Sequence, residues 1–176
     1  MEKETKIVGS EFFKESTPEK LFNKTQEYLF FKFYSISQFI YDNGGLEELK
    51  KYYQFDQESY SNLKMSLTYK IMEKILKSLP KALKIKEGLK TLVTEIEFLE
   101  SLKNILILKG TNETAGFEIT KCTLRKEFNK LAKKANKDEL LDKCCLWCLA
   151  SIPFAEKYGV IYRIELTKTG CLNYLE

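Results

Sequence analysis

The segment NILILKGTNETAGFEITKC, residues 104–122, marks the point where the sequence changes from a helical to an extended pattern. Residues 104–109 form a short run rich in β-branched side chains, and residues 117–122 read as a second strand. The residues between them, 110–116, are typical of a turn. The segment therefore predicts a β-hairpin whose loop is longer than the tightest turn classes.

Upstream of this hairpin, apolar residues recur at helical spacing. The first helix is predicted to begin in one of two ways. Either Thr17 is the N-cap with Pro18 in the first turn, or Ser16 forms a capping box with Glu19. The Asn-Gly-Gly sequence at residues 43–45 is expected to end this long helix.

Three more helices are expected before the hairpin. A short one spans residues 46–53, and a longer one is capped by Asp56. Pro80 ends the longer helix, because proline cannot continue the hydrogen-bond ladder. A fourth helix is predicted over residues 82–102.

Two helical segments and a second hairpin follow the first hairpin. The helices span residues 124–136 and 138–157, and Pro153 is expected to kink the second helix or end it early. Strands over residues 160–166 and 171–175 flank a Thr-Lys-Thr-Gly turn. The sequence therefore predicts an α+β fold, with N-terminal helices and an antiparallel four-stranded sheet made of two hairpins.

The length and composition narrow the classes of protein. A chain of 176 residues predicts a single domain, in which residues 1–15 are a candidate flexible N-terminus. The chain has no histidine, which excludes Ser-His-Asp and Cys-His catalysis and zinc sites that use histidine. Its net charge of +4 is too small to indicate a nucleic-acid binder. With no paired carboxylates and no phosphate-binding glycine loop, the residues favour a protein without enzymatic activity.

No targeting signal is recognised. Residues 1–6 are charged and no apolar segment follows them, while the apolar residues 28–40 are interrupted and too short to span a bilayer. A cytoplasmic protein is therefore expected, and peripheral contact with a membrane is compatible with this.

All five cysteines lie in the last third of the chain, and they permit two interpretations. In the first, they form a thiolate site for zinc, because four cysteines bind this metal without histidine. Cys145 and Cys148 form a CxxC pair, and Cys122 and Cys171 lie at the edges of predicted strands. The candidate ligands are Cys122, Cys144, Cys145, Cys148 and Cys171.

In the second interpretation, which we favour, the cysteines are core residues. Leu141, Cys144, Cys145, Cys148 and Ile152 share one face of the predicted helix. Free cysteine is among the most buried residue types and packs as a small apolar side chain.

A basic cluster follows the first hairpin. On a helix, most of its members share one face, which would suit an anionic membrane or a nucleic-acid surface. We favour the simpler interpretation of a solvated lysine face, since the opposite apolar face is small and is needed for the core. The candidate anionic-surface residues are Arg125, Lys126, Lys130, Lys133, Lys134 and Lys137.

The first helix is unusually rich in aromatic residues, and these are spread around its whole circumference. A helix that is apolar on every side is buried on every side. This predicts a dimer interface, the wall of an apolar ligand pocket, or a large core helix. The candidate interface or pocket residues are Phe30, Phe33, Tyr34 and Trp147, and Trp147 is expected to be largely buried.

The C-terminal third resembles a known family through four short motifs, which are ITKC (119–122), CCLWC (144–148), YGVI (158–161) and TGCLNYL (169–175). Together they resemble the 4-vinyl reductase domain, a small-molecule-binding α+β module. The order of elements is similar to that of small TRAPP subunits of the Bet-three type and of archaeal aminothiazoline-carboxylate hydrolase-like proteins. The first long helix lacks the cysteine that is acylated in TRAPP subunits, so no acyl-lipid channel is implied.

The resemblance implies a dimer-forming scaffold with an apolar cavity. We therefore expect a non-catalytic dimeric scaffold or ligand-binding module, similar to TRAPP-like vesicle-tethering subunits and 4-vinyl reductase domains. Its expected partners are a second copy or related small subunits, an apolar small molecule and a membrane surface, but no nucleic acid. The alternative is a cysteine-rich metal sensor or a thiol- or metal-dependent hydrolase, for which zinc would be the cofactor.

Overall fold

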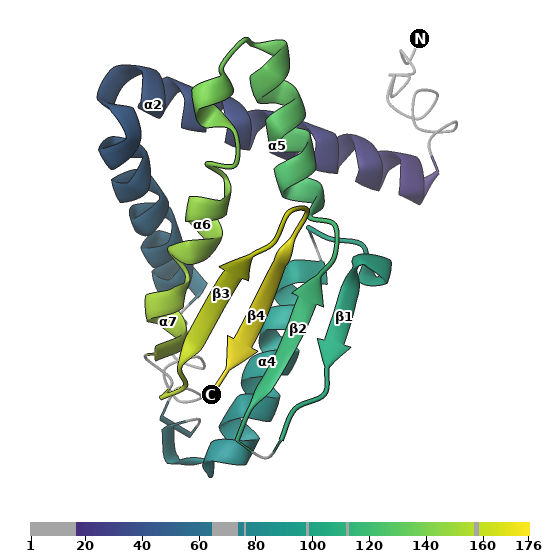
Figure 1. The fold of residues 1–176 in the computed structure, drawn as a ribbon, viewed down its shortest axis with the longest axis vertical. Helices are drawn as coiled ribbons and strands as arrows, with labels where there is room; N and C mark the ends of the chain where they lie inside the picture. Colours follow the sequence, from purple (N-terminus) through teal and green to yellow (C-terminus); the bar gives the residue numbers. More distant parts are fainter. Residues whose placement is uncertain (1–16, 65–73, 76, 98, 112, 157–158) are drawn as a thin grey trace, which may run out of the picture.

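Figure 1 shows the computed structural model, which describes residues 17–64, 74–75, 77–97, 99–111, 113–156 and 159–176. The α+β class is confirmed. The helices are α2 (Pro18–Lys64), α4 (Lys81–Glu97), α5 (Thr123–Lys134), α6 (Cys145–Leu149) and α7 (Ile152–Glu156), with 3₁₀ turns at Leu102–Asn104 and Asp138–Leu140. The strands are β1 (Ile105–Leu108), β2 (Ala115–Ile119), β3 (Tyr162–Leu166) and β4 (Cys171–Leu175).

The four strands form one antiparallel sheet in the order β1-β2-β4-β3. Both predicted hairpins are confirmed, and they are joined by pairing of β2 with β4, in which Phe117 lies opposite Asn173. β2 begins at Ala115, before the expected residue 117, because the backbone N–H of Thr111 donates to the carbonyl oxygen of Thr114 at 2.9 Å and closes the loop early.

Helix α4 covers one face of this sheet and runs behind β2 and β4 in Figure 1. Its apolar side chains Ile85, Leu89 and Leu92 pack against sheet residues that include Phe117 and Leu175. α4 ends at Glu97, before the expected residue 102. Among the described elements, no helix lies over the opposite face of the sheet in Figure 1.

A second core lies between α2, α5 and the segment that leads to α6. It is built from buried side chains such as Phe30, Leu49, Phe128 and Leu140. Cys122, at the junction of β2 and α5, contacts this core as well as the core beneath the sheet. Within the described ranges, no helix combines the length and the apolar character needed to cross a membrane.

The expected start and break of the first helix are confirmed. The side-chain oxygen of Thr17 accepts from the backbone N–H of Lys20 at 3.3 Å, as an N-cap does. Gly45 has a φ of +71°, which breaks the helical path at the Asn-Gly-Gly sequence.

The prediction of a separate helix capped by Asp56 is wrong. α2 resumes after Gly45 and continues without interruption to Lys64, so Asp56 lies inside it. Its carboxylate accepts a hydrogen bond from the indole Nε1 of Trp147 at 2.7 Å. Asp56 therefore makes a tertiary contact and does not cap a helix. The rest of the expected helix before Pro80 lies largely outside the described residues.

The prediction of one helix over residues 138–157 is also wrong. The segment is divided into a 3₁₀ turn, α6 and α7, and Asp142 has a φ of +62°. This conformation is incompatible with a continuing helix. The break between α6 and α7 lies at Ala150 and Ser151, ahead of Pro153. Contacts from α5 to Asp142 hold the first interruption in place, and local periodicity does not reveal them.

Candidate functional site at the start of helix α5

Cys122 is the N-cap of helix α5 and follows β2 after two intervening residues. The Sγ atom of Cys122 accepts from the backbone N–H of Arg125 at 3.4 Å, and its own N–H donates to the carbonyl oxygen of Thr169 at 2.9 Å. The cysteine therefore caps α5 and anchors it to the turn between β3 and β4.

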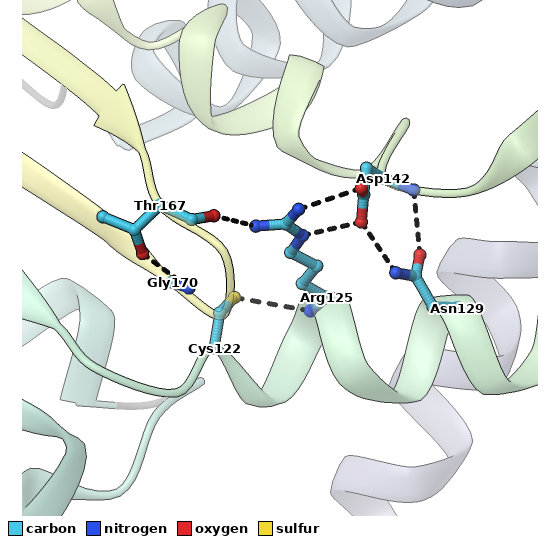
Figure 2. A network of polar contacts seen from close by, with 6 residues as sticks. All are labelled: Cys122, Arg125, Asn129, Asp142, Thr167 and Gly170. Carbon is cyan, nitrogen blue, oxygen red and sulfur yellow. Dashed lines mark hydrogen bonds and ion pairs between the residues drawn. The ribbon is translucent and has the colours of Figure 1, made fainter.

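Arg125 forms the polar network shown in Figure 2. Its Nε and Nη2 donate to the two carboxylate oxygens of Asp142 at 2.6 and 2.9 Å, and its Nη1 donates to the carbonyl oxygen of Thr167 at 2.7 Å. Asn129 donates to the same carboxylate at 2.7 Å and accepts from the Asp142 backbone N–H at 2.9 Å. The hydrogen bonds from Arg125 lower the pKa of Asp142 to about 2. The network joins α5, the approach to α6 and the second hairpin.

Glu100 supplies a second cap for α5 from a distant part of the chain. Its side chain is only 4% exposed, and its Oε1 accepts from the backbone N–H groups of Thr123 and Leu124. A carboxylate is favoured here, because the first N–H groups of a helix lack partners within the helix and carry partial positive charge. Its other oxygen, Oε2, is buried without a hydrogen-bond partner among the described residues. Sequence reasoning missed Glu100, since nothing local links residue 100 to a helix that begins at residue 123.

The five cysteines are free thiols distributed over both cores. Cys144 and Cys145 belong to the helical core, Cys171 belongs to the core beneath the sheet, and Cys122 contacts both. Burial raises the pKa of Cys122 to about 12, and the nearby Glu100 raises it further. Burial also raises the pKa of Cys148 and of Cys171. Most of the thiols are therefore protonated at neutral pH.

Cys145 differs from the other thiols. A hydrogen bond from Cys144 lowers the pKa of Cys145, and the positive charge of Arg125 lowers it further. The same hydrogen bond, together with burial, raises the pKa of Cys144. The side chain of Cys145 is only 8% exposed, so its thiolate would be sheltered from solvent.

The five thiols are close enough to influence one another's pKa. In the part of the chain that is described, no group of three or more cysteine, aspartate or glutamate side chains is placed to hold a metal ion. Zinc binding by Cys122, Cys144, Cys145, Cys148 and Cys171 stays a prediction.

A cavity of about 1120 Å³ lies beside the start of α5. We call it the α5 cavity. Its wall combines the first turns of α2, the segment that precedes β1, the beginning of α5 and the turn between β3 and β4. The lining residues are Glu19, Phe22, Asn23 and Gln26, residues 99–104, residues 121–123, Arg125, Lys126, Asn129, Asp142, Lys168 and Thr169.

The basic cluster predicted on α5 is divided between different environments. Arg125 is held by Asp142, and the ammonium of Lys137 lies 2.8 Å from a carboxylate oxygen of Asp42 on α2. Lys126 and Lys130 both lie near Glu127, at 3.7 and 3.2 Å. Lys133 and Lys134 are exposed at the end of the helix. An anionic-surface role for this set stays a prediction.

The candidate interface aromatics lie together inside the helical core. Phe30 and Tyr34 are only 5% and 4% exposed. The ring of Phe33 stacks on Tyr53, with centroids 5.6 Å apart, and meets the ring of Trp147 edge to face at 5.9 Å. Trp147 is partly buried. The aromatic surface that the chain exposes on α2 is formed by other residues, including Tyr28, Phe31 and Phe39.

Comparisons with known proteins assign no family. No protein-family model matches the chain, and no curated protein or solved structure matches it significantly.

Proposed function

We propose that this chain is a non-catalytic scaffold module that forms a dimer through helix α2. The observation that carries this proposal is an exposed apolar surface on the first half of α2, which we call the α2 apolar face. Its five residues are exposed by 40 to 68% and are Leu21, Tyr28, Leu29, Ile36 and Phe39.

The other four residues follow Leu21 by 7, 8, 15 and 18 positions. Each separation is close to a whole number of helical turns, so the five side chains lie on one side of the helix. The opposite side of α2 carries Phe30, Tyr34 and Ser37, which are buried in the helical core. The helix thus has two apolar sides, of which the described part of the chain covers one. A row of large apolar side chains exposed on one side of a helix is typical of an interaction site.

A second copy of the chain suits this face in area. Aromatic and large aliphatic side chains exposed to this degree contribute on the order of 100 Å² each, so a symmetric pair would bury roughly 1,000 Å² in total. That is about the area needed for a specific interface. Lys32 lies within the face with its ammonium 5.4 Å from the centroid of the Tyr28 ring, and its flexible stem allows the charge to reach the rim of an interface.

The grouping with 4-vinyl reductase and TRAPP-like domains is part of this proposal. The order of helices and hairpins along the chain supports this grouping. If the chain is a TRAPP-like subunit, its dimer would act in a tethering assembly. Five free thiols suit the reducing environment of the cytoplasm, where we propose that the module acts.

The test is the molar mass in solution, measured by light scattering and sedimentation over a range of concentrations. Wild-type protein is expected to dimerise, and Phe39→Glu to shift the equilibrium to the monomer, because a buried unpaired carboxylate is costly. Phe55→Glu is the matched control, since Phe55 lies on the same helix and is 67% exposed compared with 68% for Phe39.

The control variant should dimerise like the wild type, and circular dichroism should show that both variants are folded. A wild-type chain that is monomeric at every concentration would overturn the proposal. Equal weakening by both substitutions would also overturn it, because the effect would then not be specific to the α2 apolar face.

A further inference from the structure

Four lysines from four separate segments converge on the α5 cavity. Lys103 precedes β1, Lys121 follows β2, Lys126 lies in the first turns of α5, and Lys168 lies in the turn between β3 and β4. Three of them, Lys103, Lys121 and Lys168, are outside the basic cluster that the sequence suggested. Their convergence is a product of the tertiary fold.

Among the described residues, one of these four lysines is paired with a carboxylate. Lys103, Lys121 and Lys168 are exposed and form no ion pair with any residue in the described ranges. Lys126 has Glu127 at 3.7 Å and remains 79% exposed.

The acidic residues that line the cavity are mostly engaged elsewhere. Glu100 is buried and caps α5, and Asp142 is held by Arg125 and Asn129. Glu19 is open to solvent, and the side chain of Asp142 is 45% exposed but is paired with Arg125. The wall of the cavity therefore presents uncompensated positive charge.

We propose that the α5 cavity binds a small molecule that carries phosphate groups. Ammonium groups that come from four separate segments suit an anion with more than one charge, because each can form a charge-assisted hydrogen bond to a phosphate oxygen. Asn23, Asn104 and Thr169 offer hydrogen bonds to the uncharged part of such a molecule.

The shape of the site favours a small ligand over a flat membrane surface. A volume of about 1120 Å³ is large enough for a nucleotide-sized molecule. The four lysines surround a hollow, whereas a lipid surface would need its basic contacts spread over one flat face. The charged lining also favours a polar ligand over the apolar one that the family resemblance implies. This site does not depend on the dimer proposed above.

The experiment is calorimetric titration of the full chain with adenosine, AMP and ATP, at an ionic strength of about 0.15 M and without divalent cations. Affinity is expected to rise from adenosine to AMP to ATP. The double variant Lys121→Gln, Lys168→Gln should weaken ATP binding by about tenfold or more, because two charge-assisted hydrogen bonds are removed.

The matched control is Lys133→Gln, Lys134→Gln, which removes the same charge from α5 outside the cavity lining. It should change the affinity for ATP by less than about twofold, since exposed charges at a distance are screened. Unfolding in urea verifies that both double variants are stable.

Three results would overturn the proposal. The first is the absence of ATP binding to the folded wild-type chain. The second is equal weakening by the two double variants, which indicates attraction by the net charge alone. The third is binding to duplex DNA or to anionic lipid vesicles that is tighter than binding to ATP and is weakened equally by the control and the cavity substitutions. The partner would then be an extended anionic surface.

Discussion

The guanidinium of Arg125 and the carboxylate of Asp142 meet side on, with Nε 2.6 Å from Oδ1 and Nη2 2.9 Å from Oδ2. Asp142 has a φ of +62°, a conformation that few residues other than glycine adopt. The third hydrogen bond of Arg125, to the carbonyl oxygen of Thr167, ties the pair to the second hairpin. One ion pair therefore fixes the relative positions of α5, the approach to α6 and the sheet.

Replacement of Asp142 separates the contribution of its charge from that of its backbone. Asp142→Asn keeps an acceptor oxygen and tolerates positive φ, and should lower the free energy of unfolding by about 1 kcal/mol. Asp142→Ala loses the acceptor and adds backbone strain, and should cost about 2–3 kcal/mol. Unfolding in urea measures both changes. Equal losses would show that neither the acceptor oxygen nor the backbone conformation contributes to stability.

The stabilisation from this pair should depend on pH in a defined direction. The hydrogen bonds from Arg125 lower the pKa of Asp142 from 3.8 to about 2 in the folded chain. An acidic group whose pKa is lower in the folded state stabilises that state fully at pH values above the group's pKa in the unfolded chain. This stabilisation is lost as the pH falls towards the group's pKa in the folded chain. The stability difference between wild type and Asp142→Asn should therefore be constant near neutral pH and shrink between pH 3.8 and about 2. A difference that grows on acidification would contradict the ion pair.

Cys144 should control the acidity of its neighbour. The hydrogen bond from Cys144 is the largest cause of the lowered pKa of Cys145. Cys144→Ala removes the donor and should move the first thiolate transition, followed by ultraviolet absorbance, to higher pH. Cys144→Ser keeps a donor in the same place and should leave this transition closer to the wild-type pH. An unchanged first transition in Cys144→Ala would show that another group sets the pKa of Cys145.

Patterns confined to neighbouring residues predicted the largest part of this fold. The two hairpins follow from alternating strands and turn residues, and the break at Gly45 follows from the Asn-Gly-Gly sequence. These features depend on backbone preferences that act within a few residues.

The features that sequence reasoning missed all depend on distant contacts. The periodic helix pattern is interrupted at Asp142, because the side chains of Arg125 and Asn129 on α5 bind the Asp142 carboxylate. Glu100 caps a helix that starts 23 residues later. The lysines of the α5 cavity come from segments that only the tertiary fold brings together. Nothing in local periodicity indicates such pairings.

Two buried tyrosines of the helical core should respond differently to loss of their hydroxyl groups. The hydroxyl of Tyr53 donates to the Oγ of Ser37 at 2.8 Å, so Tyr53→Phe should lower the free energy of unfolding by about 1 kcal/mol. The hydroxyl of Tyr34 is buried without a partner among the described residues, so Tyr34→Phe should be neutral or stabilising. Unfolding in urea compares the two variants. A larger loss for Tyr34→Phe would show that its hydroxyl has a partner in solution.

Two glycine-to-alanine substitutions should change stability in opposite directions. A Cβ at Gly170 would overlap the carbonyl oxygen of Ile119, because the start of β4 lies directly beside the end of β2. Because backbone atoms cannot move aside cheaply, Gly170→Ala should destabilise the chain by about 2 kcal/mol or more. A Cβ at Gly88 in α4 would meet only Leu175 Cδ1, at an ordinary 3.8 Å, so Gly88→Ala should stabilise the helix by about 0.5–1 kcal/mol. Thermal unfolding of both variants measures the two effects, and a stable Gly170→Ala would mean that the turn between β3 and β4 does not approach β2 this closely.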